Sequence, residues 1–317
     1  MIRLKGAWVL WRSWWDGQES SLPMVLVRIG LPLVFLFDLW EVWRMHLIIP
    51  LWGPGDAGGM GDPEHRKTVV ELYRMFPATV GTTRIAFWVL VGSTLSISLG
   101  FLTPLACVVS VLLQTQFSLI LSPADRGIDM MIRNVLLILA FSQAGRNYGI
   151  DALLFGRREI VATWPRRLLV LQIVVMYFMA GVQKAAVAWW PWGGFSALFI
   201  ILQDMAIARF PFAWLRDLYP LTQLMSASTM VFEWGAGLVP LAAWYRWTRT
   251  RPGWLRAQFN RVGFIYWWIP FGLFMHIGIF ATMHLGIFPS AMLSMYPAFF
   301  HADEIRAFGR RWGILRD

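Results

Sequence analysis

The chain has 317 residues, of which 57% are hydrophobic and 15% are charged, and its formal net charge is +10. A soluble domain carries about 25% charged residues, so this composition excludes an ordinary soluble protein and predicts an integral membrane protein. The single cysteine, Cys107, excludes an internal disulfide and a cysteine metal site.

The first 22 residues predict a helix that lies along the membrane surface. MIRLKGAWVLWRSWW places cations on one side of a helix and tryptophans on the other, as interfacial helices do. The segment has no uninterrupted apolar core and no small-residue cleavage site, so it does not predict a cleavable signal.

Apolar stretches long enough to cross a bilayer recur through the rest of the chain. We therefore predict an all-α polytopic membrane protein with about eight transmembrane helices, which form a single membrane domain over residues 1–317. The spans are predicted near 24–44, 86–101, 104–122, 129–145, 168–186, 222–245, 263–280 and 282–300.

Two longer connections, 45–85 and 187–221, are predicted on the outer side. The first opens with PLWGPGDAGGMGDP, where glycine and proline forbid regular structure, and then predicts a surface helix at 64–76. The second contains FSALFIILQDMAIARF at 195–210, whose length of about 16 residues favours an interfacial or re-entrant helix over a span.

The charged residues are distributed unequally between the two sides of this predicted topology. Connections on the N-terminal side hold 17 Lys and Arg against 7 Asp and Glu, and those on the opposite side hold 7 against 7. The positive-inside rule then places both termini in the cytoplasm and the protein in the cytoplasmic membrane of a bacterium. The basic excess also suits anionic lipids, and nucleic-acid binding is not expected. Because no polar loop divides 263–300, this segment crosses either twice or once, and a single crossing moves the C-terminus outside.

Ionisable residues gather toward the outer ends of the predicted spans. At 1.5 Å per helical residue, Asp38 lies roughly 21 Å from the inner end of the first span, and Lys184 roughly 24 Å along the fifth. Arg28 and Glu233 lie elsewhere and are assigned structural roles. We predict a polar, substrate-binding cavity, open to the outside or to the outer leaflet, that is lined by Asp38, Glu41, Asp129, Arg133, Lys184, His276 and His284.

Lys184 carries the strongest functional signal, because an ammonium within an apolar helix must reach water, find a partner or lose its proton. The alternative to a functional role is a structural one, in which the Lys184 side chain extends to the nearby membrane interface. Asp129 and Arg133 have the alternative of pairing with each other at i,i+4. Glu233 near the middle of the membrane is expected to tie helices together.

The other polar residues have structural alternatives too. Asp38 and Glu41 share one helix face at i,i+3, so they either cap the loop that follows or pair with Arg44. His276 and His284 are about 80° out of phase on a continuous helix and have no third ligand nearby. We therefore expect no metal site there.

YFMAGVQK at 177–184, followed by Trp189 and then GGFS, resembles the signature of the HTTM family, the membrane domain shared with vitamin K-dependent gamma-carboxylase. Four further stretches resemble the family in the same order and extend the resemblance over nearly the whole chain. They are LVRIGLPLVFLFD, FWVLVGSTLSISLGF, GIDALLFGRR and FMHIGIFATMHLGIFPSAML.

The resemblance implies a role for Lys184, because the second lysine of the family run is the base that deprotonates vitamin K hydroquinone in the carboxylase. His276 also matches a family histidine. The family histidine ahead of the fourth span falls at Ile128, beside Asp129, and Gln183 replaces the first lysine of the pair. We expect a truncated form without the extramembrane half that binds protein substrates, so peptide glutamate carboxylation is not implied.

Two functions follow. In the first, the protein is a membrane enzyme in which Lys184 acts as the base on a quinone or lipid-like substrate from the outer leaflet, and the other cavity residues bind the substrate. In the second, it is a non-catalytic accessory subunit of a larger membrane complex. Transport ranks last, because only Glu233 lies near the middle of the membrane. A quinone is implied by the resemblance alone, and the residues themselves assign no cofactor.

Overall fold

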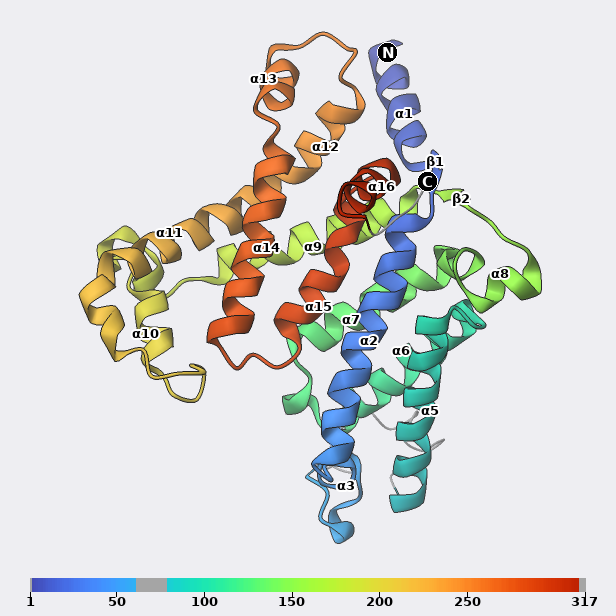
Figure 1. Cartoon of the computed structure of the whole chain (residues 1–317), viewed down its shortest axis with the longest axis vertical. Coiled ribbons are helices and arrows are strands. Elements are labelled where there is room, and N and C mark those ends of the chain that lie inside the picture. Colours follow the sequence, from blue (N-terminus) through green and yellow to red (C-terminus); the bar gives the residue numbers. More distant parts are fainter. Residues whose placement is uncertain (1, 61–78, 314–317) are drawn as a thin grey trace. The chain divides into compact units, whose positions relative to one another are not determined.

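The computed structural model describes residues 2–60 and 79–313 and is mostly helical (Figure 1), which fits the predicted all-α fold. The surface helix predicted at 64–76 lies outside the described residues. The N-terminal helix, α1, is present over Ile2–Trp15.

Helices long and apolar enough to cross a bilayer indicate a membrane protein. Within the described part of the chain there are five of them, and each coincides with a predicted span. They are α2 (Leu22–Arg44), α5 (Val80–Leu99), α6 (Thr103–Ile120), α9 (Trp164–Gln183) and α14 (Phe264–Thr282).

The other three predicted spans contain shorter helices, so a total of eight crossings stays a prediction. One span is α7 (Gly127–Phe141). The span predicted at 222–245 is divided into α11 (Tyr219–Gly235) and α12 (Val239–Trp247) by a 3-10 turn. A proline in the first turn of α12 has no N–H group to continue the preceding helix, which favours a restart at this point.

The last predicted span differs most from the structure. After α14 the chain turns and runs back beside it as α15 (Phe288–Met295). This helix has only eight residues, which make about 12 Å, whereas the hydrocarbon core measures about 30 Å. Between the two helices, Met283 adopts extended backbone and forms an isolated bridge with Ala208. Thus 263–300 reverses direction, but α15 alone is too short to cross.

A two-stranded sheet was not predicted. β1 (Gln18–Ser20) pairs antiparallel with β2 (Ile160–Ala162), just before α2 and α9 begin. Glu19 on β1 accepts two hydrogen bonds of 2.6 Å from Arg166 at the start of α9. The sheet is too short to show an alternating sequence pattern, which is why the sequence did not reveal it.

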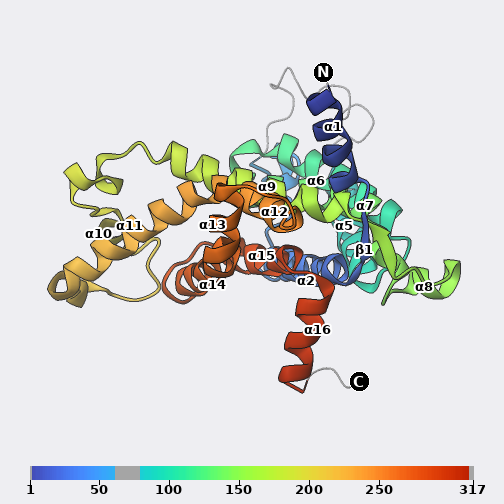
Figure 2. The same ribbon diagram turned by 90° about the horizontal axis from the view of Figure 1, so that it is seen from above.

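The structure contains two compact units. A single domain over 1–317 stays a prediction. The first comprises residues 1–168 and 297–317, and the second comprises 169–296. In the first unit, α5 packs against α2 and α6, and α6 packs against α7 (Figure 2). The remaining short helices are α3 (Ile48–Trp52), α8 (Ile150–Phe155) and α16 (Ala302–Arg311) in the first unit, and α10 (Ala197–Gln203) and α13 (Trp254–Val262) in the second.

Arg28 fits the structural role that the sequence assigned to it. Its side chain is fully buried in the first unit and donates hydrogen bonds to the carbonyl oxygens of Ile97, Ser98 and Tyr148 at 2.7 to 3.0 Å. The first two carbonyls belong to the last turn of α5, where helix carbonyls have no partner within the helix. Gly100 has a φ of +68°, and a Cβ atom there would lie 2.4 Å from the Arg28 guanidinium, so only glycine fits.

Candidate functional site

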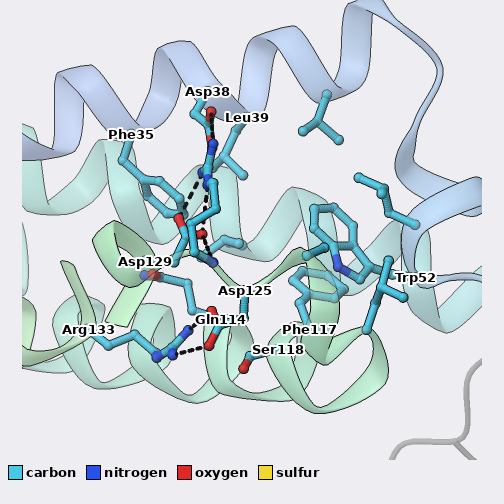
Figure 3. Close-up of a pocket in the computed structure, with 16 residues that line it drawn as sticks. Phe35, Asp38, Leu39, Trp52, Gln114, Phe117, Ser118, Asp125, Asp129 and Arg133 are labelled. Atoms are coloured by element: carbon cyan, nitrogen blue, oxygen red, sulfur yellow. Dashed lines mark hydrogen bonds and ion pairs between the residues drawn. The ribbon is translucent and has the colours of Figure 1, made fainter. Parts of the chain in front are cut away.

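Asp38, Asp129 and Arg133, predicted on the first and fourth spans, line one pocket in the first unit (Figure 3). The pocket has a volume of about 200 Å³. Its wall comes from α2, α3, α5, α6, the turn before α7 and α7 itself. The lining residues are Phe35, Asp38, Leu39, Val42, Leu51, Trp52, Leu90, Gln114, Phe117, Ser118, Leu121, Ala124, Asp125, Arg126, Asp129 and Arg133.

Arg126, which the sequence analysis did not single out, joins two of these predicted residues. Its Nη2 atom lies 2.6 Å from Asp38 Oδ2, and its Nε and Nη2 atoms each lie 2.8 Å from the Asp129 carboxylate. Burial alone would lower the pKa of Arg126, but the hydrogen bonds to Asp129 and Asp38 outweigh it and raise that pKa. Arg126 therefore stays charged and holds α2 against the start of α7.

The predicted pair of Asp129 with Arg133 is wrong. Arg133 instead donates two hydrogen bonds, of 2.8 and 2.7 Å, to Asp125. Asp125 and Arg126 occupy the turn before α7, and this turn folds back over the first turns of the helix. Asp129 thus pairs with Arg126 and Arg133 pairs with Asp125, so each residue of the expected i,i+4 pair has a partner in the turn.

The hydrogen bonds from Arg133 lower the pKa of Asp125, while burial opposes them. A pKa below the unfolded value of about 4 means that ionised Asp125 stabilises the fold above that pH. This contribution is lost as the pH falls below about 4. We expect the unfolding temperature of the wild type to fall more steeply between pH 5 and pH 3 than that of Asp125→Asn, measured by circular dichroism in detergent. Parallel profiles for the two proteins would contradict this contribution.

Glu41 and His284, predicted to line the cavity, are not among the lining residues of this pocket. Glu41 pairs with Arg44 at 2.7 Å, which confirms one of its structural alternatives. His284 lies in the second unit, is exposed, and donates its backbone N–H to the carbonyl oxygen of Ile207.

Lys184 finds a partner in the second unit. Its Nζ atom lies 2.6 and 2.7 Å from the two carboxylate oxygens of Glu233 on α11, and 4.8 Å from the ring centroid of Trp189. The side chains of Lys184 and Glu233 are 18% and 8% exposed. The Lys184 ammonium is thus paired with a buried carboxylate. Finding a partner was one of the three outcomes predicted for it.

The predicted separation of Glu233 from Lys184 is wrong, because the two side chains are in contact. The prediction counted residues along straight, independent helices, whereas the two helices approach closely at a glycine. A Cβ atom on Gly181 would lie 3.0 Å from the Glu233 Cβ. The small residue lets α11 come near the end of α9, which brings the long lysine side chain within reach of the carboxylate.

His276 is fully buried in a polar chain that the sequence analysis missed. The Tyr177 hydroxyl forms hydrogen bonds with His276 Nε2 and, at 3.0 Å, with the Tyr296 hydroxyl. The Nδ1 atom of His276 has no hydrogen-bond partner among the described residues. The signal for Tyr177 was available, because it lies seven residues before Lys184, which is the spacing of one helix face in the predicted span.

The described residues include no group of three or more His, Cys, Asp or Glu side chains that could hold a metal ion. Cys107 is a buried apolar contact on α6. No protein-family model, curated protein or solved structure matches this chain. The resemblance to the HTTM family therefore depends on its motif residues alone.

Proposed function

We propose that this chain is an integral membrane enzyme on an HTTM-type scaffold, in which Lys184 and Glu233 form an acid–base pair that acts on a quinone or lipid-like substrate from the bilayer. The observation that carries the proposal is the short contact between the Lys184 ammonium and both Glu233 oxygens inside the second unit. The apolar helices support the membrane setting, and the motif around Lys184 supports the scaffold and the substrate class.

Base chemistry at Lys184 needs the neutral amine, and Glu233 supplies a way to form it. Transfer of one proton along the 2.6 Å hydrogen bond converts the ion pair into an amine and a carboxylic acid. Burial disfavours both charged groups, so the apolar surroundings assist this transfer. The amine then takes a proton from a substrate hydroxyl, while Glu233 holds the first proton. His276 is a further polar group in this unit, and its Nδ1 atom has no hydrogen-bond partner among the described residues.

Lys184→Arg tests the acid–base role without removing the ion pair. Arginine keeps the charge beside Glu233, but a guanidinium does not lose its proton in proteins and cannot act as the base. The assay supplies vitamin K hydroquinone and oxygen to the protein in lipid nanodiscs and measures the epoxide by chromatography. We expect the variant to be folded and at least about 100-fold slower than the wild type.

The matched control is Lys5→Arg, the same exchange in the N-terminal segment, which should turn over at the wild-type rate. Wild-type activity in Lys184→Arg would exclude Lys184 as the base. Absence of turnover in the wild type itself would count against the enzyme and favour the second candidate.

The second candidate is a non-catalytic subunit of a membrane complex. A specific observation favours it: the charged residues predicted to line the cavity, namely Asp38, Glu41, Asp129, Arg133 and Lys184, all form ion pairs within the chain. Val231 on α11 and Trp267 and Phe274 on α14 are largely exposed in the described structure and need a lipid or protein neighbour. This candidate predicts stoichiometric co-purification with partner chains from native membranes, unchanged in Lys184→Arg.

A further inference from the structure

A buried glutamine lines the pocket of the first unit without a hydrogen-bond partner. Gln114 lies on α6 and is 6% exposed, and neither its Nε2 nor its Oε1 atom bonds to any described residue. It belongs to the same lining as Asp38, Asp129 and Arg133 (Figure 3). Buried amides in proteins are almost always paired, because leaving one unpaired costs free energy. The unpaired amide therefore indicates that the pocket binds a ligand with a hydrogen-bonding group.

The charged side chains of the pocket already satisfy one another. Its three carboxylates, Asp38, Asp125 and Asp129, bond its two guanidiniums, Arg126 and Arg133. Two positive and three negative charges leave the lining with a formal charge of −1. A ligand thus finds no unpaired counter-ion here, and an anion meets net repulsion. These charges favour an uncharged ligand.

Part of the pocket lining is apolar and aromatic. The rings of Trp52 and Phe117 are stacked, with centroids 4.3 Å apart and planes at 24°. Both rings line the pocket together with Phe35. A cavity of about 150 Å³ holds a benzene molecule, so the volume of about 200 Å³ suits one six-membered ring with a small substituent.

The amide of Gln114 selects that substituent. Its Nε2 atom donates and its Oε1 atom accepts along one edge of a planar group. Two straight hydrogen bonds to this edge need an acceptor and a donor side by side, as in a carboxamide or a lactam. A single hydroxyl oxygen would have to bend both hydrogen bonds, and a carboxylate carries no donor.

We propose that this pocket is a binding site for an uncharged ring that bears a carboxamide or lactam edge, with Gln114 as the partner of that edge and Trp52 and Phe117 as apolar lining that the ring contacts. The site lies within the first unit and is independent of Lys184, so it stands or falls separately from the acid–base function.

Fluorine NMR of the protein in lipid nanodiscs tests the ligand class. The probes are 4-fluorobenzamide, 4-fluoroacetophenone, in which a methyl group replaces the amide nitrogen, and 4-fluorobenzoate. We expect the benzamide to bind at least about tenfold more tightly than either of the others, after subtraction of binding to empty nanodiscs. Equal binding of the benzamide and the acetophenone overturns the proposal, and this comparison needs no variant.

Two matched variants test the role of Gln114 in binding. Gln116 is also buried, lies two positions away on α6, and is not part of the lining. We expect Gln114→Leu to bind 4-fluorobenzamide at least about tenfold more weakly, with an unfolding temperature no lower than that of the wild type, because an unpaired amide has been removed. Gln116→Leu should bind like the wild type. Unchanged binding in Gln114→Leu, or equal loss in both variants, overturns the assignment.

The ring can arrive from water or from the bilayer, and competition distinguishes these sources. Stronger displacement of 4-fluorobenzamide by 4-hexylbenzamide than by benzamide assigns the natural ligand to the membrane. Equal displacement by the two compounds assigns it to the aqueous phase. Failure of both to displace the probe shows that the probe binds elsewhere and overturns the site.

Discussion

Arg28→Met is expected to lower the stability of the first unit by about 3–5 kcal/mol. The substitution leaves the carbonyl oxygens of Ile97, Ser98 and Tyr148 without the guanidinium that now bonds all three. Removal of the buried charge recovers some desolvation energy. The Ile97 carbonyl keeps its hydrogen bond from the Gly100 N–H, but the carbonyls of Ser98 and Tyr148 lose the guanidinium. Their loss outweighs the gain, since each buried unsatisfied group costs about 1–3 kcal/mol.

The measurement is thermal unfolding in detergent, followed by tryptophan fluorescence. We expect the unfolding temperature to fall by on the order of 10 °C. Arg12→Met provides the control, because the Arg12 side chain is 70% exposed on α1. Arg28→Lys should lie between the wild type and Arg28→Met, since an ammonium cannot bond three divergent carbonyls in the geometry of a guanidinium. Equal unfolding temperatures for Arg28→Met and Arg12→Met would show that the three contacts add nothing.

The second large effect is expected at the Lys184–Glu233 pair. Lys184→Met leaves a buried carboxylate without its cation, and Glu233→Met leaves a buried ammonium. Each single variant should lose about 3 kcal/mol. The double variant Lys184→Met/Glu233→Met should recover to within about 1 kcal/mol of the wild type, because apolar residues of similar volume replace a buried pair at little cost.

A double-mutant cycle from urea unfolding of the four proteins gives the coupling energy. Additive losses, with no recovery in the double variant, would contradict the ion pair. The stable double variant also separates the candidate functions. An acid–base enzyme loses turnover in it, whereas a structural subunit keeps its place in the complex.

The sequence predicted where helices lie more accurately than it predicted how they are interrupted. Each predicted span contains a helix because an apolar stretch of sufficient length is a local property of the chain. The break between α11 and α12 and the short α15 depend on prolines within apolar runs, which lower hydropathy little. The pairing of β1 with β2 joins segments about 140 residues apart, and no local pattern reports such a contact.

The candidate site was predicted in part. Residue depth placed Asp38, Asp129 and Arg133 at the same level, and the structure gathers them around one pocket. Their partners Asp125 and Arg126 were not predicted, because these two residues lie in the turn between two predicted spans. Counting residues along separate helices did not predict the contact of Glu233 with Lys184, since it ignores the tilt of helices and the reach of a lysine side chain. Gln114 carried no sequence signal, because one amide in an apolar helix has no period or motif.

The small sheet imposes a parity rule on the topology. The chain leaves β1 into α2 and comes back at β2, so it must cross the bilayer an even number of times between the two strands. Among the described helices between the strands, α2, α5 and α6 are long and apolar enough to cross, which gives an odd number. We therefore predict a fourth crossing at α7, whose 15 residues measure about 22 Å. A crossing this short is expected to thin the surrounding membrane.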